Sequence, residues 1–278
     1  MRFLPIATVA VLATAVFAIP TTRERFAARM ARRANGTATS PHVTTFDAST
    51  ARRSKYSSRP KMPNATHIQY SGNWAGVVLS EAAGTWGSVA GTVSVPVPSD
   101  PTGGGVAAAS AWVGIDGDTC QNAIWQTGID MIYEYGEVYY QAWYEWYPDY
   151  AYDYGGITIS AGDSVTLQVW ALSTTSGLAQ IENLSNGQTV ELSISSPYAL
   201  CEQDVEWIVE DFEDGGELVP FANFGSVEFS TTIAATNAAT YAVPGANPAS
   251  ANVLDIEQNG RVLTSVAIDG WTITVNYI

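Results

Sequence analysis

Carboxylates supply the acid–base chemistry that this sequence offers, and side-chain amides add only hydrogen-bond donors and acceptors. The only histidines are His42 and His67, and the only cysteines are Cys120 and Cys201. A serine or cysteine nucleophile needs an imidazole base within hydrogen-bond reach, and zinc sites are built mostly from histidine and thiolate. We therefore expect a site made of carboxylates, amides, hydroxyls and aromatic rings, with no metal and no cofactor.

Three stretches concentrate such side chains on one face of a predicted strand, where alternate residues point the same way. The shared faces carry Trp112, Gly114 and Asp116 in "AWVGIDGDTC", Ile124, Gln126, Gly128 and Asp130 in "IWQTGID", and Glu206, Ile208, Glu210 and Phe212 in "VEWIVEDFED". The last stretch also places Asp211 on its opposite face. An ordinary core does not bury unpaired charges, so at least one acidic face should line a cleft or meet solvent. For any single carboxylate, a solvated surface charge is the alternative.

Eight aromatic residues crowd the segment 140–154, "YQAWYEWYPDYAYDY". Two interpretations are open. The rings could form the core and rim of a β-sandwich, or they could form a cleft wall on which an extended polymer lies, because aromatic side chains offer large and rigid contact areas. In the second case Glu145 would point into the cleft beside Trp143 and Tyr147.

The elements that must position these residues are strands. From about residue 68 onward, short runs rich in Val, Ile, Thr, Trp and Tyr alternate with Gly, Asn, Asp and Pro clusters. Asn186-Gly187, Asn259-Gly260 and Asp269-Gly270 are typical of hairpin turns. No stretch after residue 66 has a helical period. The pattern predicts an all-β fold of the two-sheet antiparallel β-sandwich type.

The chain is expected to begin with two segments that precede the folded domain. "MRFLPIATVAVLATAVFAIP" has one basic residue, an apolar run and small residues near Ala18, which is typical of a signal peptide over residues 1–18. Residues 19–66 would be a basic propeptide, with its boundary somewhere in 54–72, and residues 67–278 the sandwich domain. No later segment has 18 consecutive apolar residues. We expect a secreted protein with no membrane partner.

Secretion bears on the cysteines and the sequons. In an oxidising compartment, two cysteines favour one disulfide over a free catalytic thiol. Sequons at Asn35, Asn64 and Asn183 are compatible with glycosylation.

Charge is distributed unevenly along the chain. Ten of the 12 Lys and Arg residues lie between Arg23 and Lys61, and 25 of the 27 acidic residues follow residue 61. Such an acidic domain excludes nucleic acid as a partner. The acidity could serve solubility alone, or it could suit the domain to acid, where the carboxylates become neutral and few cations remain to repel one another. We expect the basic leader to bind and inhibit its own acidic domain near neutral pH and to loosen on acidification.

Several blocks of the sequence resemble the fungal glutamic peptidases, the eqolisin family. They are "NWAG" (73–76), "WVGIDGDTC" (112–120), "QTGID" (126–130), "AWYEWYPDYAYD" (142–153), "EWIVEDFE" (206–213), "FGSVEF" (224–229) and "LDIEQNG" (254–260). The resemblance implies a secreted, acid-active, pepstatin-insensitive endopeptidase that acts on polypeptides. It also implies a β-sandwich similar to concanavalin A-like lectins and glucanases. We expect a monomer.

The resemblance also implies roles for particular residues. Glu206 would be the general base that activates water, and Gln126 would stabilise the tetrahedral oxyanion. Trp112, Asp116, Asp130 and Glu145 would bind substrate or support the site. Cys120 and Cys201 would form a disulfide.

Trp125, beside the glutamine, has no assigned role at this point. Two other functions also stay open. A glycoside hydrolase would use two of the carboxylates across a sugar site. A lectin-like sandwich would bind carbohydrate through its aromatic residues.

Overall fold

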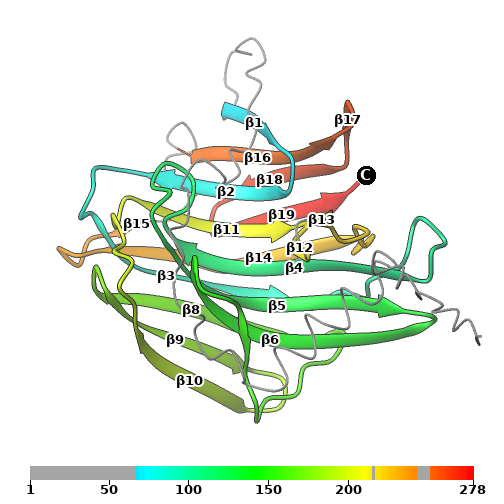
Figure 1. Ribbon diagram of the computed structural model, residues 1–278, viewed down its shortest axis with the longest axis horizontal. Coiled ribbons are helices and arrows are strands. Elements are labelled where there is room, and N and C mark those ends of the chain that lie inside the picture. Colours follow the sequence, from blue (N-terminus) through cyan, green and yellow to red (C-terminus); the bar gives the residue numbers. More distant parts are fainter. Residues whose placement is uncertain (1–66, 215–216, 243–250) are drawn as a thin grey trace, which may run out of the picture.

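The computed structural model describes residues 67–214, 217–242 and 251–278, which form two large β-sheets packed face to face (Figure 1). The predicted signal peptide and propeptide lie outside the described residues, as do the sequons at Asn35 and Asn64. Among the described residues no helix is long and apolar enough to span a membrane.

The first sheet carries the polar stretches singled out above. Its strands lie in the order β1 (His67–Ser71), β16 (Ala251–Gln258), β2 (Trp74–Ser80), β11 (Asp204–Glu210), β4 (Val106–Ile115), β5 (Ile124–Glu134), β6 (Glu137–Tyr147) and β7 (Tyr152–Asp153), with β17 (Arg261–Val262) paired to β16. Neighbouring strands are antiparallel except β1, which runs parallel to β16.

The second sheet covers one face of the first. Its order is β10 (Gln188–Ser195), β9 (Ser176–Asn183), β8 (Ser164–Ser173), β3 (Trp86–Ser94), β14 (Ser226–Thr236), β19 (Thr272–Tyr277) and β18 (Thr264–Asp269), with β15 (Tyr241–Ala242) paired to β14. A separate small hairpin joins β12 (Glu213–Asp214) to β13 (Glu217–Leu218). The all-β, two-sheet sandwich predicted from the sequence is therefore confirmed.

The core lies between the two sheets and takes one face of every central strand. On β4, β5 and β11 the odd-numbered residues supply it, so the even-numbered residues face away from the second sheet. Three core tryptophans also donate hydrogen bonds, two of them to strands of the second sheet, because a buried indole N–H needs an acceptor. Trp207 donates to the Ala90 carbonyl at 2.8 Å, Trp125 to the Trp170 carbonyl at 3.2 Å, and Trp146 to the Tyr198 carbonyl at 2.9 Å.

The three predicted hairpin turns are confirmed. Asn186-Gly187 joins β9 to β10, Asn259-Gly260 joins β16 to β17, and Asp269-Gly270 joins β18 to β19. At Asn259 and Gly260 the φ angles are 53° and 77°. Two consecutive positive φ values are what a tight hairpin turn requires, and Asn and Gly tolerate them best.

Candidate active site

Glu206 and Gln126 lie in one row across the first sheet, although 80 residues of sequence separate them. Glu206 on β11 is directly opposite Gly114 on β4, and Gly114 is directly opposite Gln126 on β5. The row continues to Glu145 on β6. Figure 1 shows these four strands side by side in the order β11, β4, β5, β6. All four residues are on the face turned away from the core, so the sheet presents a carboxyl and an amide side by side.

Gly114, which has no side chain, lies between Gln126 and Glu206. A Cβ at this position would lie 3.2 Å from Gln126 Cβ and 3.2 Å from Glu206 Oε1. Gln126 Cβ and Glu206 Oε1 are therefore no further apart than twice that distance. It would also lie 2.9 Å from Cζ3 of Trp112, closer than neighbouring carbons normally approach. Any side chain here would fill the space over which Gln126 and Glu206 meet.

Gln126 is held by one neighbour and has unused hydrogen-bonding capacity. Its side chain is 4% exposed, and Nε2 donates to Oε2 of Glu145 at 2.7 Å. Oε1 is buried and has no hydrogen-bond partner among the described residues. An amide nitrogen carries two N–H groups and an amide oxygen accepts up to two hydrogen bonds. Gln126 can therefore still offer one donor and one acceptor to a bound molecule.

Glu206 is a fully buried carboxyl whose two oxygens have no hydrogen-bond partner among the described residues. Burial, which disfavours the charged form, is the main cause that raises its pKa well above the ordinary value. The charges of Asp204, Asp116 and Asp118 add to this effect. In acid, Glu206 is thus a neutral carboxylic acid that can both donate and accept a proton.

Two buried tryptophans lie on the same face of the sheet beside this row. Trp112 on β4 and Trp143 on β6 lie on either side of Gly128, where a Cβ would be 2.5 Å from Trp112 Cβ and 2.8 Å from Trp143 Cζ2. Their ring nitrogens are fixed: Trp112 Nε1 donates to Glu210 Oε2 at 2.9 Å, and Trp143 Nε1 to Ser110 Oγ at 3.1 Å. The cluster they form on this face also contains Val78, Ile208 and Leu254.

The aromatic residues of β6 are divided between the two faces of this strand. On β6, Trp143 and Glu145 face the site, while Trp146 belongs to the core and Tyr140 and Tyr144 pack against it. Asp130, on β5, lies on the site face two positions beyond Gly128 and is 1% exposed. This placement fits a supporting position better than a substrate-contacting one.

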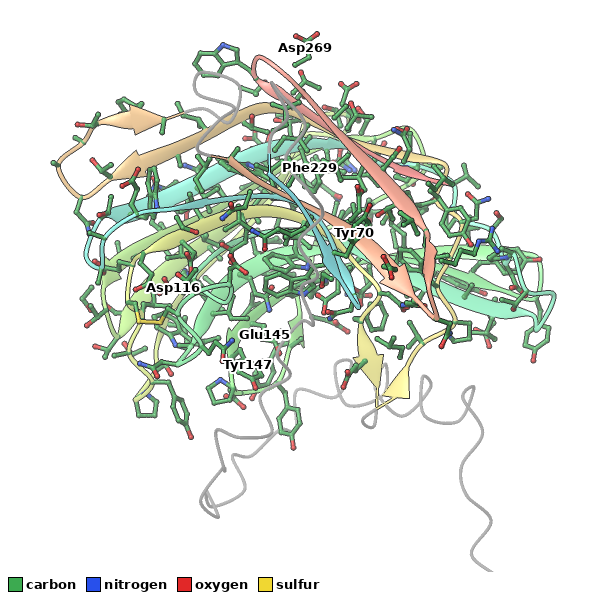
Figure 2. The ribbon with its side chains drawn as sticks, turned by 90° about the horizontal axis from the view of Figure 1, so that it is seen from above. Tyr70, Asp116, Glu145, Tyr147, Phe229 and Asp269 are labelled. Atoms are coloured by element: carbon green, nitrogen blue, oxygen red, sulfur yellow. A yellow bond between two sulfur atoms is a disulfide. The ribbon has the colours of Figure 1, made fainter. Side chains whose placement is uncertain are left out.

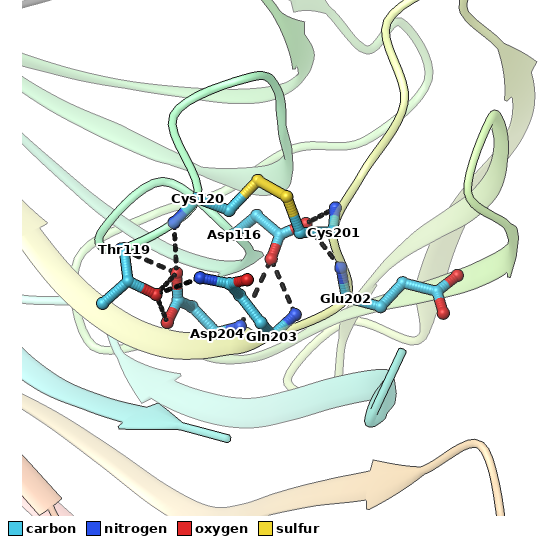
Figure 3. Close-up of a disulfide and its surroundings, with 7 residues drawn as sticks. All are labelled: Asp116, Thr119, Cys120, Cys201, Glu202, Gln203 and Asp204. Atoms are coloured by element: carbon cyan, nitrogen blue, oxygen red, sulfur yellow. Dashed lines mark hydrogen bonds between the residues drawn. A yellow bond between two sulfur atoms is a disulfide. The ribbon is translucent and has the colours of Figure 1, made fainter. Parts of the chain in front are cut away.

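Asp116 does not continue the strand alternation expected from the sequence. β4 ends at Ile115, and Asp116 adopts a φ of 67°. Its carboxylate turns toward the segment that precedes β11 and accepts backbone N–H hydrogen bonds from residues 201 to 204 at 2.7, 2.8, 2.9 and 3.2 Å (Figure 3). Burial raises the pKa of Asp116, and these hydrogen bonds oppose the rise. Asp116 therefore positions the start of the strand that carries Glu206.

The predicted disulfide is present beside this turn. Cys120 and Cys201 are bonded, with their Cα atoms 6.1 Å apart (Figure 3). Asp204 reinforces the junction, because it accepts hydrogen bonds from the backbone N–H and the hydroxyl of Thr119 at 2.8 and 2.7 Å. The loop after β4 and the start of β11 are thus joined by one covalent bond and a group of buried hydrogen bonds.

Two other sequence expectations concern Trp125 and Asn183. Trp125 points into the core, where its ring packs 5.2 Å from that of Trp146, so it does not shape the space over Gly114. Asn183 is fully buried, and its Nδ2 donates to the Thr158 carbonyl at 2.9 Å and to Asp163 Oδ2 at 2.7 Å. The expectation that Asn183 could be glycosylated is therefore wrong for the folded domain.

Sequence reasoning overlooked the importance of Gly114, although it placed this glycine on the correct face. The available signal was a glycine inside a strand pattern, which often marks a close approach of another group. It also gave no role to Ser110 and Glu210, which hold the two tryptophans. The roles of Ser110 and Glu210 become visible only once the register of the sheet is known.

A second buried carboxyl makes stability depend on pH. Asp211 is 1% exposed, and burial raises its pKa to about 8; the charge of Glu210 adds to the rise, and the hydrogen bond from Gln258 Nε2 at 2.7 Å opposes it. Asp255 behaves similarly, with burial raising its pKa to about 6. Carboxyls with raised pKa values stabilise the fold in acid, and this stability is lost as pH rises through those values.

We expect Asp211→Asn to make the free energy of unfolding less dependent on pH. Unfolding free energies would be measured between pH 4 and pH 8 in a Glu206→Gln background, to prevent self-digestion. One pKa unit corresponds to about 1.36 kcal/mol, so the parent protein should lose several kcal/mol over this range, and Asp211→Asn much less. Asp269→Asn, at an exposed carboxyl (Figure 2), is the matched control. Equal pH slopes in the parent and in Asp211→Asn would contradict the prediction.

The site can be compared with those of known proteins. A family model described as the peptidase A4 family matches residues 72–277. Aspergillopepsin-2 of Aspergillus niger is 43% identical over an alignment 298 positions long, which covers 100% of this chain and 100% of that protein. Scytalidopepsin B of Scytalidium lignicola is 40% identical over 224 residues, covering 77% of this chain and 81% of that protein. The crystal structure of scytalido-glutamic peptidase with a transition state analog inhibitor is similar with a TM-score of 0.67 and 41% identity, over 74% of this chain and 98% of that one.

Proposed function

This chain belongs to the peptidase A4 family, the eqolisins, and is a glutamic endopeptidase; we propose that Gln126 and Glu206 are its catalytic pair and that it works in acid. The observation that carries the proposal is the row of Glu206, Gly114 and Gln126 across three adjacent strands. Family membership also disfavours the glycoside hydrolase and lectin interpretations.

In the proposed mechanism a substrate peptide lies over Gly114, with its scissile carbonyl between the two side chains. The general-base role expected for Glu206 needs an oxygen that accepts a proton from water, and a neutral carboxylic acid has one. One oxygen of Glu206 takes a proton from the attacking water while the other gives its proton to the carbonyl oxygen. Glu206 stays neutral overall, and the product of this step is a tetrahedral diol.

Collapse of the diol reverses these proton movements. Glu206 donates its proton to the leaving nitrogen and receives one from a hydroxyl of the diol as the C–N bond breaks. Gln126 donates its second N–H to the oxygen on which negative charge develops, and its Oε1 holds the attacking water. No covalent intermediate with the protein is required.

The raised pKa of Glu206 supports activity in acid. The mechanism uses the protonated carboxyl, which is present at low pH and is lost as pH rises through the raised pKa. Activity that depends on this form should therefore be high in acid and decline toward neutral pH.

The experiment is digestion of a denatured protein at pH 3 and at pH 7, with pepstatin present. We expect cleavage at pH 3 that pepstatin does not inhibit. Gln126→Ala should lower kcat/KM by about 100- to 1000-fold, the usual cost of removing one oxyanion donor. Equal cleavage at the two pH values would contradict the acid mechanism, and full activity of Gln126→Ala would exclude Gln126 from the site.

We also propose that the protein is secreted as a precursor whose basic leader, residues 19–66, inhibits it near neutral pH. The position of β1 supports a processing site before His67, because β1 pairs with β16 along its whole length. Amino-terminal sequencing of the secreted enzyme tests this, and a mature chain that begins after residue 71 would contradict it.

A further inference from the structure

We infer that Glu145 is a positioning residue that fixes the orientation of the Gln126 amide, an inference that rests on the function proposed for Gln126. The two residues are directly opposite each other on β5 and β6, and Gln126 Nε2 donates to Glu145 Oε2 at 2.7 Å. An ordinary glutamate is ionised above about pH 4.3, and in that form it accepts hydrogen bonds and donates none. Contact with Glu145 therefore selects the orientation in which the amide nitrogen faces β6.

The orientation matters because the two ends of an amide group do different chemistry. If the Gln126 amide were turned by 180°, Oε1 would face the carboxylate of Glu145, and two acceptors would repel each other at this distance. In the observed orientation Oε1 and the second N–H are left for the substrate and the attacking water. Glu206 lies on the opposite side of Gln126 from Glu145, across Gly114. Glu145 thus keeps the catalytic donor and acceptor available without contacting the substrate itself.

Glu145 is partly buried on β6. Tyr147 is the next residue on the same face of β6, and burial raises the pKa of its hydroxyl, with the Glu145 charge as the second cause. Figure 2 shows Glu145 and Tyr147 near each other at one side of the molecule. A partly desolvated carboxylate forms stronger hydrogen bonds than one in water, so the Gln126–Glu145 contact is suited to hold one orientation.

A double-mutant cycle tests the inference, with kcat and KM measured on an internally quenched peptide at about pH 5, where an ordinary glutamate is ionised. Glu145→Ala should lower kcat by about 10- to 100-fold, as expected when a catalytic group is misplaced, with KM changed less than about twofold. Glu145→Gln should restore part of kcat, since its amide oxygen can still accept from Gln126. In a Gln126→Ala background, Glu145→Ala should have no further effect on kcat, because the group it positions is absent.

Glu137→Ala is the matched control, since Glu137 is exposed on the same strand, and it should keep the parental kcat. An unchanged kcat in Glu145→Ala would overturn the inference. So would an equal loss in both backgrounds, which would mean that Glu145 acts independently of Gln126. If Gln126→Ala alone kept full activity, the proposed function itself would fail, and the cycle distinguishes this result from the other two.

Discussion

Glu206→Gln should lower kcat/KM at pH 3 by at least about 1000-fold, within the range that a proton-transferring side chain contributes. The replacement has almost the same shape as the carboxyl, so the row across β11, β4 and β5 stays intact. An amide cannot take a proton from water or give one to a leaving nitrogen at this pH. Hydrolysis of an internally quenched peptide measures the loss. Glu228→Gln, at an exposed position of the second sheet, is the control and should retain full activity.

The same variant should be more stable than its parent at pH 7. The raised pKa of Glu206 means that its stabilising contribution exists in acid and is lost as pH rises, whereas a glutamine stays neutral throughout. Gln126→Ala and the double variant Gln126→Ala/Glu206→Gln, both without efficient proteolysis, provide the comparison. The double variant should have the higher Tm at pH 7, with a smaller difference at pH 3. A higher Tm for Gln126→Ala at pH 7 would contradict the burial argument.

Gly114→Ala should lower kcat/KM by about 100-fold, because it places a methyl group where the scissile bond must lie and displaces the reacting groups. The added carbon would contact Glu206 Oε1, Gln126 Cβ and Cζ3 of Trp112. The indole of Trp112 is fully buried and hydrogen-bonded to Glu210, so it cannot easily move aside. Peptide hydrolysis at pH 3 measures the effect, and a thermal melt checks that the domain still folds.

Gly155→Ala is the control for this substitution. A Cβ at Gly155 would meet nothing within 4 Å, so activity and Tm should match those of the parent. If Gly114→Ala were equally active, substrate could not lie over Gly114, and the proposed arrangement of Gln126 and Glu206 around the scissile bond would be wrong.

Local patterns in the sequence predicted most of the fold correctly. Alternation placed Gln126 and Glu206 on strand faces, and the Asn-Gly and Asp-Gly pairs marked three hairpins, because both signals depend on residues that are close in sequence. The Cys120–Cys201 disulfide was expected both from the presence of two cysteines in a secreted chain and from the family resemblance. Gln126 and Glu206 lie in one row because β4 lies between β5 and β11. This strand order depends on long-range packing, which local sequence patterns do not predict.

The errors also have physical causes. Alternation fails at Asp116 because β4 ends one residue earlier, and the following Asp-Gly pair is a turn signal that outweighs strand continuation. The sequence left open whether the aromatic residues of β6 form the core or a cleft wall, because both faces of that strand are rich in aromatic residues. Asn183 met the sequon rule, but burial in the sandwich removes it from the surface, and a sequon carries no information about burial.

The parallel pairing of β1 with β16 was likewise absent from the expectations. It joins the first described strand to one that lies near the other end of the chain. Nothing in "HIQYS" distinguishes such an edge strand from an antiparallel one, because the same residues suit both kinds of pairing.

The alignment of β11, β4 and β5 has a consequence for how this protein can misfold. Neighbouring residues of a strand point to opposite sides, so a slip of one residue in either pairing would carry Glu206 or Gln126 to the inner side of the sheet. A slipped chain would therefore have no peptidase activity at all, rather than a reduced rate. In a refolded preparation, specific activity is then proportional to the fraction of molecules whose central strands have paired correctly.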